Sequence, residues 1–199
     1  MDFEKIIELK ENAIKTYIPI IRDDLIKFLK EYFVKNNVKK VLEIGSAIGY
    51  SSIVMASFSS DIHIDTIERD SILALNAISN IKDFGLENQI NLINADALTL
   101  ELDTNNKYDL IFIDASKTKY IDFFNKYKTY LNNNGSIISD NMNLHDVTNM
   151  EFSKRKQRLR KKINEYIAFL NNLTSYKTTY MLNIGDGIAI SVLNDEFNN

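Results

Sequence analysis

Residues 41–51, with the sequence VLEIGSAIGYS, constrain the fold of this chain more than any other stretch. The segment opens as a short, largely apolar and β-branched strand. Gly45 and Gly49 then allow a sharp turn and the close approach of a ligand, which a Cβ would prevent. Ser51 and Ser52 are expected to cap the helix that follows. A strand, a glycine turn and a helix in this order are typical of a nucleotide-binding βαβ unit.

Glu43 and the glycine spacing distinguish this loop from a dinucleotide site. The spacing is G-x-x-x-G instead of G-x-G-x-x-G, and the carboxylate stands two residues before the first glycine. A carboxylate beneath the ligand repels a diphosphate and attracts a positively charged group. S-adenosylmethionine (SAM), which carries a sulfonium ion, is such a ligand. The alternative is a plain glycine turn, which any α/β protein can contain.

Strands and helices alternate along the rest of the chain, after two helices within residues 1–35. This pattern predicts an α/β protein with a doubly wound, mostly parallel seven-stranded sheet over residues 38–193. Gly185, Asp186 and Gly187 form a turn signal between the last two strands, which should therefore be an antiparallel hairpin. The expected strands cover residues 41–44, 63–68, 90–94, 108–114, 136–140, 176–183 and 187–193, and the expected helices cover 3–15, 20–34, 71–84, 120–131 and 153–171.

Composition narrows the class of protein. A chain of 199 residues that is 45% hydrophobic suffices for one domain with a substantial core, so we expect a single domain over residues 1–199. There are no cysteines, which excludes disulfides and thiolate metal sites. No apolar run reaches the length of a membrane span, and the first residues lack a signal-peptide pattern, so a cytoplasmic location is expected.

Acidic residues stand at the ends of several predicted strands. In an open α/β sheet, ligands bind beyond the carboxyl ends of the parallel strands. Glu68 follows Gly45 by 23 residues, about where an acidic residue binds ribose hydroxyls in a dinucleotide fold. Asp96 ends the third strand, where it could meet an adenine amino group. Each acid alone could be a helix cap, but their repetition at one edge favours a ligand site.

The fourth and fifth strands end in a set of hard oxygen donors. Asp114, Asp140 and Asn141 offer two carboxylates and an amide oxygen, which suit Mg²⁺. Lys117 follows the first of these by three residues. A lysine beside a divalent cation gives up its proton more readily, so Lys117 could accept a proton from a hydroxyl; the alternative is an ordinary surface lysine.

Positive charge is concentrated in one segment, residues 154–162, where seven of nine residues are Lys or Arg. The chain has 24 basic and 27 acidic residues, so the remainder holds 17 basic against 27 acidic ones. An acidic body with one basic segment suggests a local anion-binding surface, and the alternative is a solvated helix face.

Together these segments resemble the class I SAM-dependent O-methyltransferases of the metal-requiring catechol and caffeoyl-CoA type (O-methyltransferase family 3). The resemblance covers about residues 17–193 and implies a Rossmann-like methyltransferase fold and a homodimer. The motifs that carry it are residues 41–51 (VLEIGSAIGYS), 66–70 (TIERD), 94–97 (NADA), 112–117 (FIDASK) and 139–141 (SDN).

The resemblance implies a role for each matching residue. Lys117 and Asp114 would be catalytic, with Lys117 as the proton acceptor, and a divalent cation, Mg²⁺, would be bound by Asp114, Asp140 and Asn141. The SAM contacts would come from Ile21, Glu43, Gly45, Ser51, Glu68, Asp96, Ala97 and Asp114.

Within the family, the chain is most similar to bacterial members that methylate 5-hydroxyuridine at the wobble position of tRNA. Residues 19–21 (PII), the basic segment and residues 185–191 (GDGIAIS) support this closer match. It implies that tRNA is a partner and that the anticodon loop is bound by Lys154, Arg155, Lys156, Arg158, Arg160 and Lys161.

The departures from the family pattern concern the acceptor most. Ser46 stands where threonine is frequent and Ser116 where alanine or a bulkier residue is usual, and residues 142–146 are more polar than the family's usual apolar stretch. Three alternatives therefore stay open. They are an O-methyltransferase acting on a small catechol-like or phenylpropanoid hydroxyl, a nicotinamide oxidoreductase, which the glycine spacing and Glu43 disfavour, and a SAM-binding module without turnover.

Overall fold

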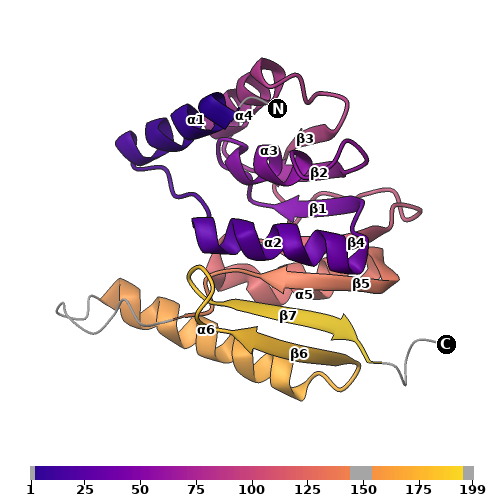
Figure 1. The fold of residues 1–199 in the computed structure, drawn as a ribbon. Helices are drawn as coiled ribbons and strands as arrows, with labels where there is room; N and C mark the ends of the chain where they lie inside the picture. The colour runs from indigo at the N-terminus through magenta and orange to yellow at the C-terminus, as the bar shows by residue number, and fades with distance from the viewer. Residues whose placement is uncertain (1–2, 144–153, 195–199) are drawn as a thin grey trace. The chain divides into compact units, whose positions relative to one another are not determined.

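The computed structural model describes residues 3–143 and 154–194 of the 199-residue chain (Figure 1). The contacts divide the chain into two compact units, residues 1–103 and 104–199, which we call the first and the second unit. Residues 144–146, which belong to the polar segment singled out in the sequence, lie outside the described residues. The single domain expected over residues 1–199 stays a prediction.

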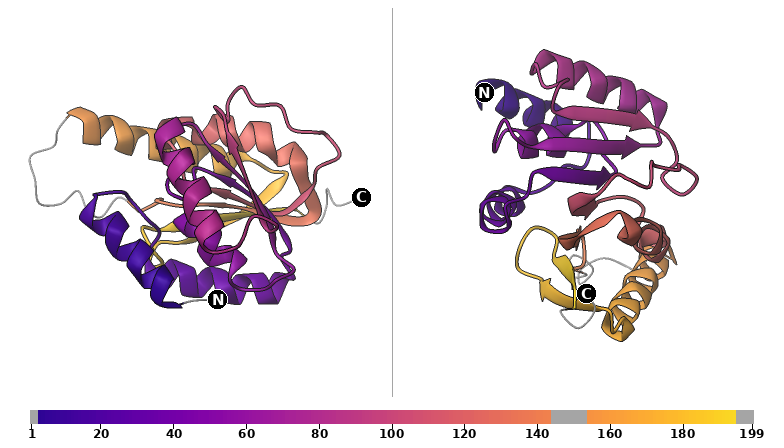
Figure 2. Two further views of the ribbon diagram at one scale, coloured as in Figure 1. Left: turned by 90° about the horizontal axis from the view of Figure 1, so that it is seen from above. Right: turned by 90° about the vertical axis from the view of Figure 1, so that its right-hand side faces the viewer.

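The first unit is a three-stranded parallel sheet with helices around it. Strand β1 pairs with β2, and β2 pairs with β3, both in parallel. Helix α4 packs on β3 and β2 (Figure 2). Its elements are α1 (Phe3–Lys15), α2 (Asp23–Asn36), β1 (Lys40–Ile44), α3 (Tyr50–Ala56), β2 (His63–Glu68), α4 (Ser71–Asp83) and β3 (Ile90–Asn94).

Local sequence explains where these elements begin and end. The only proline, Pro19, lies between α1 and α2, where it prevents a continuous helix. The side chain of Asp70 caps α4 by accepting hydrogen bonds from the N–H groups of Ile72 and Leu73. Strand β1 is buried over its last four residues, as the apolar run predicts for a strand covered on both faces.

The second unit combines a parallel strand pair with an antiparallel hairpin. Strand β4 pairs in parallel with β5, while β7 pairs antiparallel with both β5 and β6, which confirms the predicted hairpin. Helix α5 packs against β4 and β5, and α6 against β6. Its elements are β4 (Tyr108–Ile113), η1 (Lys117–Lys119), α5 (Tyr120–Tyr127), η2 (Lys128–Tyr130), β5 (Leu131–Ser139), α6 (Lys154–Asn172), β6 (Tyr176–Met181) and β7 (Ile188–Leu193).

Strand β5 begins five residues earlier than the sequence predicts. Leu131 pairs with Tyr108 and Ser136 with Leu110, so that residues 132–135 stand opposite Asp109 alone. Three asparagines and a glycine in succession favour a turn, but here they form a bulge within the strand. The Asn132 side chain stabilises it by donating from Nδ2 to Oδ1 of Asp109 over 2.7 Å. The expected helix over 120–131 is correspondingly shorter.

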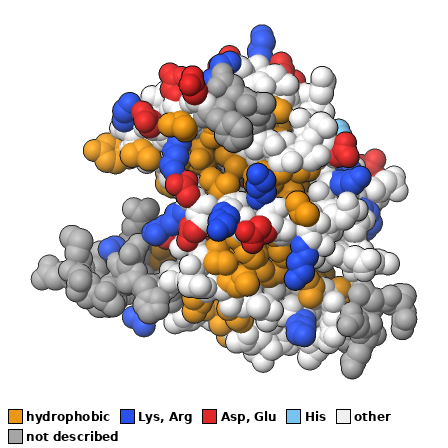
Figure 3. Space-filling model, viewed as in Figure 1, with side chains coloured by type: hydrophobic (Ala, Val, Ile, Leu, Met, Phe, Trp, Pro, Cys, Tyr) orange, Lys and Arg blue, Asp and Glu red, His pale blue; other side chains and the backbone are white. Residues whose placement is uncertain are grey.

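Helix α1 of the first unit carries exposed apolar side chains. Ile7 and Ile14 are exposed on α1, and Tyr17 follows that helix; orange side chains gather over it in Figure 3. None of the helices in the described ranges is both long and apolar enough to cross a membrane. The homodimer implied by the resemblance stays a prediction.

Candidate functional site

Glu43 is enclosed in the first unit, where three hydroxyl groups donate to its carboxylate. Ser51 Oγ donates to Oε1 over 2.5 Å, Thr66 Oγ1 donates to Oε2 over 2.6 Å, and Ser52 Oγ also donates to Oε2. Burial raises the pKa of Glu43, and the three donated hydrogen bonds oppose that shift. The carboxylate thus joins β1 to β2 and to the first turn of α3.

This network corrects the expectation that the two serines cap α3. The helix has Gly49 at its N-cap, with a φ of +81° and no side-chain cap. The hydroxyls of Ser51 and Ser52 instead turn back to the carboxylate of β1. A helix N-terminus needs acceptors for its N–H groups, whereas these two hydroxyls donate to a buried carboxylate that has no water to solvate it.

The glycine loop between β1 and α3 is held by Glu68, the last residue of β2. Oε2 of Glu68 accepts the backbone N–H of Ala47 over 2.9 Å, and Oε1 accepts that of Asp70 over 2.8 Å. Ala47 has a φ of +47°, and Gly45 one of +98°. The loop is therefore preformed by groups of the protein itself.

The remaining predicted cofactor residues of the first unit lie at or near the carboxyl ends of its strands, except Ile21, which is buried between α1 and α2. Asp96 comes two residues after β3, and its Oδ1 accepts the N–H of Leu98 over 2.8 Å. Ala97 beside it is buried. Because parallel strands share one carboxyl edge, the structure brings Glu68, Asp96 and the glycine loop to the same edge.

In the second unit, the predicted metal ligands and Lys117 come together. Asp114 directly follows β4 and Asp140 directly follows β5, at the carboxyl edge of this parallel pair. Asn141 Nδ2 donates to Oδ1 of Asp114 over 3.3 Å, and Lys117 Nζ donates to Oδ1 of Asn141 over 2.5 Å. Asn141 has a φ of +61°, a left-handed conformation that asparagine tolerates better than most residues.

Asp140 is 3% exposed, and few neighbouring groups stabilise the negative charge of its carboxylate. Its Oδ1 accepts the backbone N–H of Asn141 over 2.6 Å. Burial, followed by the negative charge of Asp114, raises the pKa of Asp140 to about 7; Asp186 adds to the shift and Lys117 opposes it. A divalent cation would supply the missing positive charge.

The donor set fits Mg²⁺. Among the described residues, no three His, Cys, Asp or Glu side chains converge as metal ligands. The residues that would hold a cation here are Asp114, Asp140 and, through its amide oxygen, Asn141. Mg²⁺ is commonly bound by one or two carboxylates while it keeps several waters, so two carboxylates and an amide oxygen suffice.

Sequence reasoning missed three groups near these residues. Thr66 and Ser52 bind the carboxylate of Glu43, and Asp186 contributes negative charge at Asp140. The two hydroxyl residues gave no signal beyond strand and cap propensity. Asp186 was visible between two glycines, but that pattern indicated only a hairpin turn.

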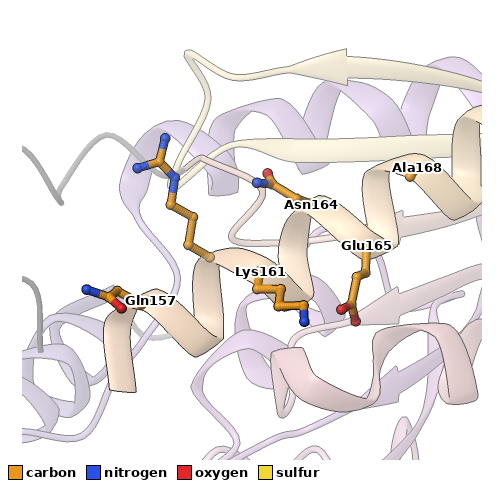
Figure 4. A pocket seen from close by; sticks show the side chains of 6 residues that line it. Gln157, Lys161, Asn164, Glu165 and Ala168 are labelled. Carbon is orange, nitrogen blue, oxygen red and sulfur yellow. The ribbon is translucent and has the colours of Figure 1, made fainter. Parts of the chain in front are cut away.

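The predicted RNA-binding residues begin α6, and the structure describes all of their side chains except that of Arg155. Lys162, next to them, pairs with Glu165 over 2.7 Å, a hydrogen bond that lowers the pKa of Glu165. A hollow on this helix has Lys161 and Glu165 on one side, a turn apart (Figure 4). Of the predicted RNA-binding residues whose side chains are described, all are exposed: Lys154, Lys156, Arg158, Arg160 and Lys161.

A parallel sheet with a G-x-x-x-G loop after β1 and acidic residues at its carboxyl edge is typical of class I SAM-dependent methyltransferases. The chain belongs to the O-methyltransferase family, whose sequence profile matches residues 2–193. A Staphylococcus aureus protein, solved as a candidate caffeoyl-CoA O-methyltransferase, is 36% identical, with a TM-score of 0.87 over 95% of this chain and 92% of that one. This match confirms the predicted fold class and family.

Two curated relatives bear substrate names. A caffeoyl-CoA O-methyltransferase of Stellaria longipes is 32% identical over 110 residues, or 52% of this chain and 46% of that enzyme. A catechol O-methyltransferase of Niastella koreensis is 27% identical over 177 residues, or 84% of this chain and 79% of that enzyme. The matched segment thus spans less than half of the plant enzyme's length.

Proposed function

We propose that this protein transfers the methyl group of SAM to a hydroxyl oxygen with the help of a divalent cation. The observation that carries the proposal is the cluster in the second unit. There, Asp140 is buried beside Asp114, and Lys117 donates to Asn141 over 2.5 Å. Such a set can hold a cation, orient a hydroxyl and accept a proton within one small region.

The first unit would contribute most of the SAM contacts. The preformed loop at Gly45 presents backbone groups to the ligand without a loss of conformational entropy on binding. Glu68 keeps lone pairs free after it accepts two N–H groups, so it can also bind the ribose hydroxyls. The three hydrogen-bond donors to Glu43 are side chains of the protein itself. Glu43 would therefore act by supporting the loop from the strand that precedes it.

The second unit would supply the proton acceptor and the metal ligands. A divalent cation held by Asp114, Asp140 and Asn141 would make the acceptor hydroxyl more acidic. Lys117, once neutral, takes the hydroxyl proton, while the oxygen forms a bond to the methyl carbon and the carbon–sulfur bond breaks. The rate of this displacement depends on holding oxygen and carbon in line, about 3 Å apart.

For the acceptor, we propose 5-hydroxyuridine at the wobble position of tRNA. Its 5-hydroxyl and adjacent 4-carbonyl oxygen can chelate a cation as a catechol does. The exposed cations at the start of α6 support an RNA substrate, because they provide charge for backbone phosphates. A base in a single-stranded loop is also the form in which proteins usually read RNA.

A small catechol-like phenol is the second candidate. It is favoured by the names of the relatives from Stellaria longipes and Niastella koreensis. In that case the basic start of α6 would be a solvated helix face, and catalysis would be independent of it.

The deciding experiment measures transfer of labelled methyl from SAM to tRNA that carries 5-hydroxyuridine, with Mg²⁺ and with a chelator. Transfer with Mg²⁺ that yields 5-methoxyuridine, and none with the chelator, is the expected result. The same tRNA without the 5-hydroxyl serves as the control. If catechol is methylated with Mg²⁺ and tRNA acquires no label, the acceptor is a small phenol. If neither is methylated, the proposed reaction is contradicted.

A charge-matched pair of variants tests the role of α6. Replacing Lys154, Arg158 and Lys161 by alanine should weaken tRNA binding. The slope of log affinity against log salt concentration should become shallower by the amount expected for about three lost phosphate contacts. The control replaces three exposed lysines of α2, which removes the same charge elsewhere; these are Lys27, Lys30 and Lys35. Equal losses in both variants would mean that net charge, and not α6, governs binding.

A further inference from the structure

The turn between β6 and β7 is hydrogen-bonded to the segment that follows the proposed metal ligands. The carbonyl oxygen of Gly187 accepts the N–H of Met142 over 2.8 Å, and that of Asp186 accepts the N–H of Asn143 over 2.7 Å. The Asn143 side chain returns a bond from Nδ2 to the carbonyl oxygen of Leu182 over 2.8 Å. Three hydrogen bonds thus join the turn to two consecutive residues.

Gly187 is the point of closest approach. A Cβ at this position would lie 2.6 Å from the backbone nitrogen of Asn143 and 2.7 Å from its Cβ. Gly187 also has a φ of +81°, which L-residues with side chains rarely adopt. A side chain there would push the backbone of Asn143 away, and the two backbone hydrogen bonds would lengthen.

A shift of Asn143 would pass directly to the ligands. Asn141 and Asp140 precede Asn143 by two and three residues. Met142, which separates Asn141 from Asn143, is buried. Asn141 also holds a left-handed φ of +61°. A residue in that conformation needs outside contacts to keep it there, since the backbone relaxes from it when released.

We propose that the turn at residues 185–187 positions Asp140 and Asn141 for cation binding by fixing the backbone of Met142 and Asn143. Gly187 is its positioning residue. This inference rests on the metal site of the proposed function, and it gives the glycines of the hairpin a role beyond turn formation.

The test compares Gly187→Ala with Gly85→Ala in the full-length protein. Gly85 has a φ of +64° and no atom within 4 Å of its would-be Cβ, so alanine there meets the same backbone penalty without a clash. Binding of Mn²⁺ is followed by electron paramagnetic resonance, and melting temperature is measured on the same samples. Exchange of the amide protons of Met142 and Asn143 reports the hydrogen bonds directly.

We expect Gly187→Ala to weaken Mn²⁺ binding by about 10-fold, as changes behind metal ligands commonly do, with faster amide exchange at both residues. Gly85→Ala should keep its Mn²⁺ affinity within about two-fold and lose less in melting temperature, because alanine there meets no clash. Equal Mn²⁺ affinity in the two variants would overturn the inference.

Two further variants separate the possible failures. If Gly187→Ala does not fold, Asn143→Ala removes the side-chain bond to Leu182 and should still weaken Mn²⁺ binding; unchanged affinity would then overturn the inference. Asp140→Asn tests the site itself. If that variant binds Mn²⁺ as the wild type does, the proposed metal site is wrong and the inference is overturned with it.

Discussion

Among the residues that the structure describes, each unit buries one carboxylate at or near the carboxyl end of a strand, and the surroundings of the two differ. Glu43 is fully buried and receives hydrogen bonds from three hydroxyl groups. Asp140 is almost as buried, but it receives the N–H of Asn141 and lies beside the charges of Asp114 and Asp186.

The difference distinguishes Glu43, a carboxylate with a structural role, from Asp140, a carboxylate suited to bind a cation. Three hydroxyls occupy most of the acceptor sites of the Glu43 carboxylate, so we infer that it fixes β1, β2 and α3. Asp140 has burial without matching donors, which is costly unless a cation is bound. The comparison therefore predicts that Glu43 matters for stability and Asp140 for function.

Asp140→Asn should give the largest functional effect. Mn²⁺ affinity should fall at least about 100-fold, because a charged ligand is lost, and Mg²⁺-dependent methyl transfer should disappear. Without metal, the variant should melt no lower than the wild type, since the substitution removes a carboxylate whose charged form is disfavoured by burial. Calorimetric Mn²⁺ titration and thermal melting check both parts, and a large drop in melting temperature would erase the contrast with Glu43.

Lys117→Met should slow methyl transfer by roughly 100-fold without weakening Mn²⁺ binding, as expected for the loss of a proton acceptor. Lys119→Met is the control, because Lys119 lies in the same short helix and pairs with Asp122 over 3.2 Å. The rates are measured across pH. An unchanged rate in Lys117→Met would show that another group takes the proton.

Glu43→Ala should destabilise the protein by about 3 kcal/mol, because three buried hydroxyls lose their acceptor. Glu43→Gln should cost less, since hydroxyls can rotate to accept from an amide. Urea unfolding measures both. The glutamine variant should bind S-adenosylhomocysteine within about three-fold of the wild type; a large loss of affinity at unchanged stability would indicate direct ligand contact instead.

The pH dependence of cation binding sharpens the comparison further. Because the pKa of Asp140 is raised to about 7, Mn²⁺ must displace a proton below that pH, and its affinity should rise with pH until about 7. The metal-free protein shows the opposite pH dependence. The contribution of Asp140 to its folding stability falls as pH rises from the ordinary carboxyl range to about 7. Calorimetry in buffers of different ionisation enthalpy detects the released proton.

Much of the architecture could be predicted because burial on both faces leaves a plain signal in sequence. The continuous apolar run of β4 and the glycines before α3 each indicated a strand or turn that the structure contains. The acidic residues at strand ends could also be placed at one edge, since parallel strands share it.

What could not be predicted depends on side-chain partners far apart in sequence. Thr66 is 23 residues from Glu43, and its hydrogen bond follows from the register of β1 against β2. The bulge in β5 escaped prediction because its asparagines favour turns. Asp186 reaches the neighbourhood of Asp140 only through the pairing of β7 with β5.

That bulge also sets where the chain tolerates a change of length. Asn133 and Asn134 are exposed, so an extra residue there can be accommodated in the bulge. From Ser136 onward β5 is in strict register with β4 and β7, and one inserted residue would turn every later side chain to the opposite face. Asp140 would then take the place of Asn141, and Ser139 that of Asp140. Two insertion points a few residues apart should therefore differ completely in their effect on cation binding.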